Sequence, residues 1–229
     1  METSKIKTYK KRINLILRTF GNTLIILSVF FLFLGFWPYL KAETIYEWDQ
    51  LVGQKFYVQG DATTLPKGSS PLGSVITAPP PIAVTPINTT FSIIIPAINV
   101  NAYVTPNIDP NNVQQYEQAL TKGAAQARGT VYPGQQGNSY IFAHSSTNFW
   151  DIAHYNSVFT LLRNVNVGDL IVTFYNGKRY DYYVTQKIII SPSSVSYLTP
   201  VAQGRQLTLQ TCDPPGINLN RLLIIAKMR

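Results

Sequence analysis

Residues 167–184 of the chain are VGDLIVTFYNGKRYDYYV. Two runs rich in β-branched and aromatic residues, 167–175 and 179–184, flank the dipeptide Asn176-Gly177. Asn-Gly between two such runs is a strong hairpin signal, because both residues tolerate the positive φ angles of the favoured two-residue turn. The stretch therefore predicts an antiparallel β-hairpin.

The sequence around this hairpin is also mostly strand-like. Runs of apolar residues predict strands at 92–96, 139–144, 206–212 and 221–228. Helical pattern is confined to residues 110–127, which follow Asp109 as a possible N-cap, and to the shorter stretch 149–162. Many strands, few helices and short connections predict a mostly β fold that is a closed or nearly closed barrel.

The composition excludes several classes of protein. Of the 229 residues 45% are hydrophobic, so the chain is not intrinsically disordered. It contains one cysteine and two histidines. This count rules out an intramolecular disulfide, a multi-thiolate zinc site, an iron–sulfur cluster and a three-histidine metal site. We expect no cofactor, and no metal site is predicted from these residues.

Positive charge is concentrated at the N-terminus. The chain has a formal net charge of +8, and residues 1–18 carry six basic side chains against one acidic side chain. The remaining basic residues are spread thinly, so no basic stripe is left for a nucleic-acid backbone.

An uncharged apolar segment, residues 19–40, follows the basic tail. As a helix it would span about 33 Å, enough to cross a hydrocarbon core of roughly 30 Å. Trp37 and Tyr39 lie at its outer end, where amphipathic rings favour the membrane interface. The positive-inside rule then predicts a single-pass plasma-membrane protein with a cytoplasmic N-terminus and residues 41–229 outside.

The alternative to an anchor is a cleaved signal peptide. A signal peptide needs a short apolar region and a small-x-small cleavage site. Here the apolar run is long and ends in Trp37-Pro38-Tyr39-Leu40-Lys41, with Ala42 as the only small residue nearby. The sequence favours an uncleaved transmembrane helix, and the length of the uncharged run disfavours a buried core helix.

The chain outside the membrane divides by composition. Residues 41–90 form a juxtamembrane segment and a linker, in which 41–62 are compatible with a short helix and 63–90 are rich in proline. Proline-rich runs prefer an extended conformation, so we expect a semi-rigid spacer. Residues 91–229 then form the folded domain, which is long enough for one hydrophobic core.

The single cysteine, Cys212, ends one predicted strand. It could be a small buried hydrophobe, the partner of a cysteine in another chain, or a nucleophile. Strand alternation places the leucines of 207–211 and Thr211 on one face, and Thr208, Gln210 and Cys212 on the other. Asp213 and two prolines follow and stop the strand. A thiol at a strand end beside a loop is well placed to meet a substrate.

Two other residues complete a candidate site for acyl transfer. Arg221 opens the next predicted strand, so antiparallel pairing would bring it beside Cys212, where a cation stabilises a thiolate and can donate hydrogen bonds to an oxyanion. Acyl transfer to an amine also needs a general acid, usually histidine. His144 ends a predicted strand, whereas His154 lies within the predicted helix 149–162, so we favour His144.

Four segments together resemble one family. They occur in the family's order and cover residues 91–229: IIPAINV at 94–100, GNSYIFAHS at 137–145, FTLL with VGDLI at 159–171, and TLQTC at 208–212 with Arg221 nine residues on. These segments resemble the motifs of the sortases, which are membrane-bound cysteine transpeptidases.

The resemblance implies an eight-stranded sortase β-barrel with short helices, preceded by the N-terminal transmembrane helix. It implies that Cys212 is the nucleophile, His144 the general acid/base and Arg221 the donor to the oxyanion or substrate carbonyl, with Thr211 as a residue that binds substrate. The implied partners are secreted proteins with a C-terminal LPxTG-type sorting signal and an amine of a cell-wall precursor or a pilin. The acyl group would be held as a thioester on Cys212 before transfer.

The subclass follows less directly from the sequence. The chain shows neither a C-terminal span nor an obvious aromatic lid motif, which are typical of pilin-polymerising class C sortases. The residues that follow Cys212 resemble those of classes D and E. Asp109, Glu117 and Asp151 are too scattered in the sequence to predict a calcium site.

Two alternatives to a sortase are an L,D-transpeptidase and a barrel without catalytic activity. L,D-transpeptidases place a His-Gly pair directly before the cysteine, where this chain has Gln210-Thr211. A catalytically inactive, membrane-tethered β-barrel that binds sorting peptides or cell wall is the other alternative. The enzyme is favoured because the cysteine, histidine and arginine are all present.

Overall fold

The computed structural model describes the whole chain except residues 1, 60–78, 146–156, 195–203 and 216–218. The chain forms two compact units, Met1–Leu40 and Lys41–Arg229. Helix α1, Glu2–Val52, contributes to both. Each unit is described by itself below.

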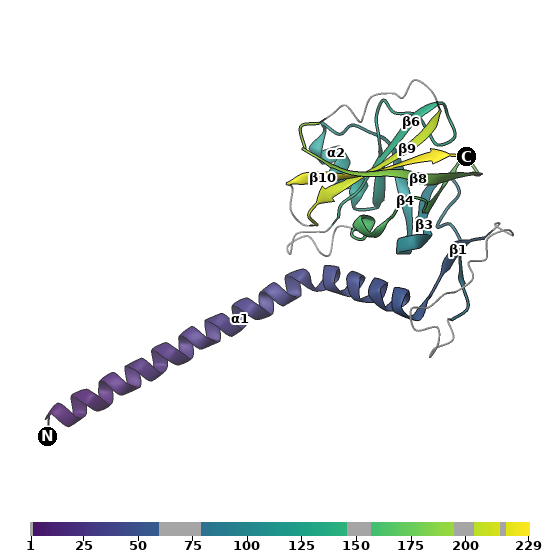
Figure 1. Ribbon diagram of the computed structural model, residues 1–229. Helices are drawn as coiled ribbons and strands as arrows, with labels where there is room; N and C mark the ends of the chain where they lie inside the picture. The colour runs from purple at the N-terminus through teal and green to yellow at the C-terminus, as the bar shows by residue number, and fades with distance from the viewer. Residues whose placement is uncertain (1, 60–78, 146–156, 195–203, 216–218) are drawn as a thin grey trace. The chain divides into compact units, whose positions relative to one another are not determined.

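Over the described residues, eight strands form a closed barrel in the order β10-β8-β7-β3-β4-β5-β6-β9 (Figure 1). The strands are β3 Phe91–Ile95, β4 Val100–Ile108, β5 Gly123–Ala127, β6 Gly137–Phe142, β7 Leu170–Tyr175, β8 Lys178–Ile190, β9 Arg205–Asp213 and β10 Asn220–Met228. A short 3-10 helix, η1 (Pro96–Ile98), joins β3 to β4. The expected eight-stranded barrel is confirmed.

The hairpin predicted from Asn176-Gly177 joins β7 to β8. Tyr175 pairs with Lys178 across the turn, and both turn residues have positive φ angles, 48° and 76°. The barrel interior is filled by alternate, inward-facing residues of the strands. Ile93, Leu209 and Ile224 are completely buried in one apolar cluster. The alternation predicted for 207–212 is therefore seen, with the leucines in the core.

The helix predicted at 110–127 is wrong in its extent. Helix α2 covers only Val113–Leu120, and Gly123–Ala127 is strand β5, paired in parallel with β4. Gly123 has a φ of +152°, and a Cβ there would lie 2.6 Å from the carbonyl oxygen of Tyr103. Small residues permit this close approach of two strands, so tertiary pairing overrides the helical preference of the alanines.

The second predicted helix, 149–162, falls mostly on residues outside the described part of the chain, and so does His154. The described end of this stretch consists of turns and leads into a 3-10 helix, η2, at Leu162–Asn164. Phe159 in these turns is completely buried, and its N–H donates to the carbonyl of His144 at 3.1 Å. This bond connects the segment to the end of β6.

The last turns of α1, residues 41–52, pack against the barrel. Tyr46 contacts the main core cluster, and the side-chain amide of Asn164 donates to the Glu43 carboxylate at 3.3 Å. After the helix, β1 (Phe56–Val58) pairs in parallel with β2 (Ile82–Val84). Val58 is buried with apolar residues of β3 and β7. Part of the region predicted as an extended spacer is therefore a strand, because it finds a pairing partner.

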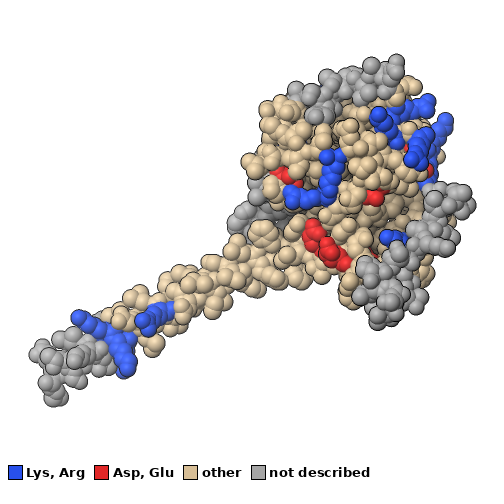
Figure 2. Space-filling view, in the orientation of Figure 1, with Lys and Arg blue, Asp and Glu red and all other residues tan. Residues whose placement is uncertain are grey.

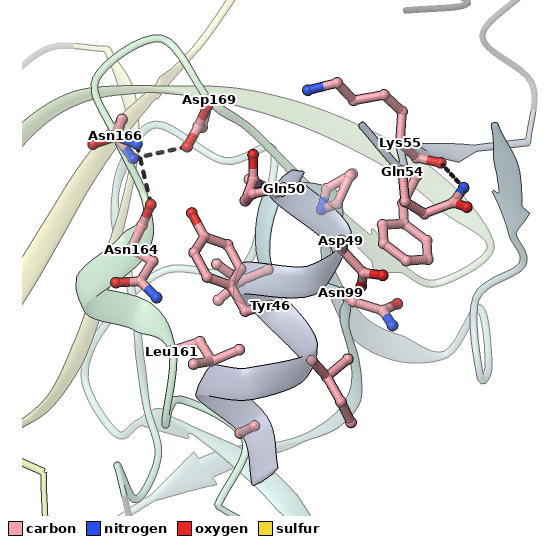
Figure 3. A pocket seen from close by; sticks show the side chains of 16 residues that line it. Tyr46, Asp49, Gln50, Gln54, Lys55, Asn99, Leu161, Asn164, Asn166 and Asp169 are labelled. Carbon is pink, nitrogen blue, oxygen red and sulfur yellow. Dashed lines mark hydrogen bonds between the residues drawn. The ribbon is translucent and has the colours of Figure 1, made fainter. Parts of the chain in front are cut away.

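A cavity of about 370 Å³ lies between these turns of α1 and the barrel. Figure 3 shows Tyr46 and Asp49 of α1 on one side and Asn166 and Asp169 on the other. Asp169 accepts from the N–H of Asn166 at 2.7 Å, and burial raises the pKa of Asp49 above its ordinary value. The juxtamembrane turns thus belong to the folded unit.

In the other unit, the segment Lys10–Trp37 is long and apolar enough to cross a membrane. Figure 2 shows basic side chains near the N-terminal end of this helix, followed by turns without charged side chains. It is a candidate membrane anchor.

Candidate active site

The cysteine and the arginine predicted from the sequence face each other on neighbouring strands. β9 and β10 are antiparallel, and Cys212 pairs with Arg221 in their register. Directly opposed residues of such a pair point to the same face, with Cβ atoms about 4.5–5.5 Å apart. Cys212 is a free thiol and is half-buried. The arrangement places a guanidinium beside the sulfur at the rim of the barrel.

His144 reaches the same place from a third strand. β6 is parallel to β9, and their last registered pair is Phe142 with Gln210. The N–H of Ala143 donates to the Gln210 carbonyl at 3.2 Å. His144 lies two residues beyond this pair, just after the end of β6, and Cys212 lies two residues beyond it on β9, so continued alternation would turn both to the side that Phe142 and Gln210 share. The three predicted residues are thus brought to one end of the barrel by three adjacent strands, seen together in Figure 1.

Thr211 lies on the opposite, core-facing side of β9. It is buried, and its hydroxyl donates to the carbonyl of Ala143 at 2.9 Å. This bond joins the residue before the sulfur to the residue before the imidazole. Thr211 therefore has a structural contact that sets the spacing of the two strands, and its expected contact with substrate stays a prediction.

The bond of Thr211 can be tested against a matched control on the same strand. Thr208 is also buried, and its hydroxyl donates to the side chain of Asn138 at 2.9 Å, away from the site. We expect Thr211→Val and Thr208→Val each to lower the free energy of unfolding by about 1–3 kcal/mol, because each leaves an acceptor without its donor. Only Thr211→Val should also lower the acylation rate of Cys212. Equal rates in both variants would contradict this role.

Apolar side chains lie on the same side of β10 as Arg221. Leu223 of β10 pairs with both Gln210 of β9 and Ile188 of β8, and it packs in a cluster with Ile188, Ile190 and Tyr140. The Tyr140 hydroxyl donates to Gln210 at 2.6 Å, and burial raises the pKa of Tyr140 well above its ordinary value. This side of β9 and β10 thus carries a small buried apolar cluster and one fixed polar pair.

The end of β9 is fixed by an ion pair that the sequence analysis missed. The carboxylate of Asp213, the residue after the cysteine, is buried and accepts from Nε and Nη2 of Arg163 in η2. The carbonyl of Arg163 in turn accepts from the ammonium group of Lys187 on β8. No local pattern connects these residues, because 50 positions separate Arg163 from Asp213.

The N-cap of α2 is Asn112, so the prediction of Asp109 as the cap is wrong. Asp109 and a second carboxylate, Glu117, have other partners here. Asp109 pairs with Arg128 at 3.1 Å, and Glu117 of α2 lies 3.3 Å from Nε2 of His144. Glu117 had no sequence signal for this role, since 27 residues separate it from the histidine. Among the described residues, no three His, Cys, Asp or Glu side chains lie close enough together to hold a metal ion.

The geometry has the components of nucleophilic acyl transfer. It combines a half-buried thiol, an imidazole one strand away and a guanidinium on the next strand. The guanidinium is held partly in place by Nη1, which donates to the carbonyl of Asn220 at 3.2 Å. A thiol nucleophile, an acid/base group and a fixed cationic donor are the parts that such a reaction requires.

Comparison with known proteins agrees with this chemistry. A search of curated proteins finds no match. Among solved structures, sortase A from Corynebacterium diphtheriae, a lid mutant, is 26% identical with a TM-score of 0.52 over 62% of this chain and 70% of that one. Sortase C1 of the GBS Pilus Island 1 is 27% identical with a TM-score of 0.52, over 61% and 63%. Sortase C-1 from Actinomyces oris is 25% identical with a TM-score of 0.52, over 62% and 76%.

The family comparison covers the barrel except for the first two residues of β3. The model of the sortase domain matches residues 93–229, which include Cys212, His144 and Arg221. A fold, a site geometry and a family match over the same residues lead to one conclusion: this chain belongs to the sortase family of cysteine transpeptidases.

Proposed function

We propose that the chain is a membrane-anchored sortase that cleaves an LPxTG-type sorting signal through a thioester on Cys212 and passes the acyl group to an amine of a cell-wall precursor or a pilin. The observation that carries the proposal is the register that pairs Cys212 with Arg221, with His144 just beyond the end of β6, the strand that pairs with β9.

The reaction is written in two steps whose protons balance. In the first, the Cys212 thiolate attacks the carbonyl carbon of the signal, a C–S bond forms and the C–N bond breaks, while the His144 imidazolium gives its proton to the leaving amine. In the second, the incoming amine gives a proton to His144 and attacks the thioester. The C–N bond forms, the C–S bond breaks, and the thiolate and imidazolium are regenerated.

Arg221 and Thr211 complete the assignment of the site. The planar guanidinium of Arg221 can donate two parallel hydrogen bonds to the carbonyl oxygen as it becomes an oxyanion. Thr211 supports the site from the core side through Ala143, as its bond of 2.9 Å indicates. We propose the domain limits given by composition, with residues 91–229 as the catalytic domain.

The proposed location follows from charge and hydropathy. The apolar segment would anchor the chain in the plasma membrane, and the basic N-terminal tail would remain in the cytoplasm. The catalytic unit would then be outside, where sorting signals emerge from secretion and cell-wall precursors are available. The residues that follow Cys212 in the sequence favour a class D or E type of sortase.

The test of this function is formation of the acyl-enzyme. The full chain in detergent is incubated with a panel of LPxTG-type peptides, and its intact mass is measured. We expect an acyl adduct on Cys212, no adduct in the folded Cys212→Ala variant, and transfer of the acyl group to added glycine peptides.

Two results would contradict the proposal. An adduct that persists in Cys212→Ala would place the chemistry elsewhere. Peptide binding without any adduct across the panel would favour the catalytically inactive, peptide-binding barrel.

A further inference from the structure

Helix α2 lies against the barrel next to the end of β6. Its Ala119 and Leu120 are buried in the core cluster, and its N-cap Asn112 accepts from the N–H of Gln115 at 3.1 Å. Tyr116 packs on the core and meets the ring of Phe142 edge to face, with the ring centroids 6.5 Å apart. Because core packing and a cap fix the helix, the side chains on this turn have a defined position relative to β6.

Glu117 follows Tyr116 on this helix and contacts the imidazole of His144. Its Oε2 lies 3.3 Å from Nε2, and the side chains of His144 and Glu117 are 25% and 31% exposed. A carboxylate at Nε2 favours the ring form that carries a proton there, whether the imidazole is neutral or charged. The nitrogen that exchanges a proton with the substrate is then Nδ1.

Tyr116 also interacts with the Glu117 carboxylate. Burial raises the pKa of Tyr116, and the charge of Glu117 and a hydrogen bond to it raise it further. The phenol is therefore protonated and donates to Glu117. The Cys212 thiol and the Arg221 guanidinium also act on the Tyr116 hydroxyl, in opposite directions. The Tyr116 hydroxyl is thus near enough to Glu117 of α2, Cys212 of β9 and Arg221 of β10 to feel their charges.

We infer that Glu117 is a positioning residue of the transpeptidase. It holds the His144 ring by Nε2, so that Nδ1 carries the proton to the leaving amine and from the incoming one. The inference rests on the proposed function, and it adds a carboxylate to the cysteine, histidine and arginine. The roles are those of a nucleophile–imidazole–carboxylate triad, in which the carboxylate sets the orientation of the ring and determines which ring nitrogen carries the proton.

The chain is well suited to a direct test, because it has only two histidines. The full chain is labelled with ¹⁵N-histidine in detergent, and a His154→Gln variant assigns the two rings. In the wild type we expect the ¹⁵N shifts of neutral His144 to place its proton on Nε2. Glu117→Leu removes the acceptor and should lose this preference, whereas Glu117→Gln keeps an acceptor oxygen and should retain it.

Activity provides the second readout. We expect Glu117→Leu to lower kcat by up to about 10⁴-fold with little change in KM, as when the carboxylate that orients a reacting histidine is lost. Glu117→Gln should lower kcat less than Glu117→Leu does. Asp109→Asn is the matched control, since it also removes a paired carboxylate near α2 but one that pairs with Arg128 instead of His144.

The outcomes separate this inference from the proposed function. A proton on Nε2 that persists in Glu117→Leu would overturn the inference, whether or not the protein acylates. An equal loss of kcat in Asp109→Asn would also overturn it, because the effect would then be general to this part of the fold. Absence of any acyl adduct in the wild type would reject the proposed function. The ¹⁵N shifts would still show whether Glu117 holds the proton of His144 on Nε2.

Discussion

Alanine in place of His144 is expected to lower the rate of transfer to an amine by about 10²–10⁴-fold, the usual contribution of a positioned general acid/base. The physical reason is that an amine leaves poorly without a proton, and His144 is the imidazole that the parallel pairing of β6 and β9 brings to the level of Cys212. The measurement is single-turnover acylation of the full chain, followed by intact mass.

His154→Ala serves as the control for this variant, since it removes the second histidine of the chain. It should leave acylation within a few-fold of the wild-type rate. A large loss in His154→Ala together with normal rates in His144→Ala would reverse the assignment of the two histidines.

Lysine in place of Arg221 is expected to lower kcat by about 10²–10³-fold, the usual effect of removing one donor to an oxyanion. Lysine keeps the positive charge but loses the planar pair of donors, so the variant separates charge from hydrogen-bond geometry. The position is sensitive because Arg221 lies directly opposite the nucleophile in the register of β9 and β10.

Arg205→Lys is the matched control, because Arg205 is exposed at the other end of β9. Its kinetics should equal those of the wild type. If Arg221→Lys also acylates at the wild-type rate, the guanidinium is a structural charge at a strand edge and takes no part in the reaction.

The sequence predicted the strands and the pairing around the nucleophile well. Asn176-Gly177 defined the hairpin of β7 and β8, since only a few residue types adopt the turn between them. Alternation in 207–212 defined which side of β9 faces the core, because the two faces of a strand meet different surroundings. The short connection from Cys212 to Arg221 left antiparallel pairing as the simplest outcome, and this pairing is present.

The helix predicted at residues 110–127 shows where the local sequence pattern gave a wrong result. Gly123–Ala127 is rich in alanine and continues a helical pattern, yet it is a strand, because a parallel pairing with β4 requires small residues at a close backbone approach. The pairing partner lies in a different part of the chain, so propensity within the segment could not reveal it.

Taken alone, the sequence determined the strand-rich barrel, the apolar N-terminal segment and the cysteine, histidine and arginine, since these depend on residue type, alternation and short spacing. The tertiary structure decided which side chains surround them. Glu117 beside His144 and Arg163 on Asp213 come from elements that are distant in sequence, and no periodicity within a segment records such contacts. Only closure of the barrel, with α2 and η2 packed on its rim, brings those charges to the imidazole and to the end of β9.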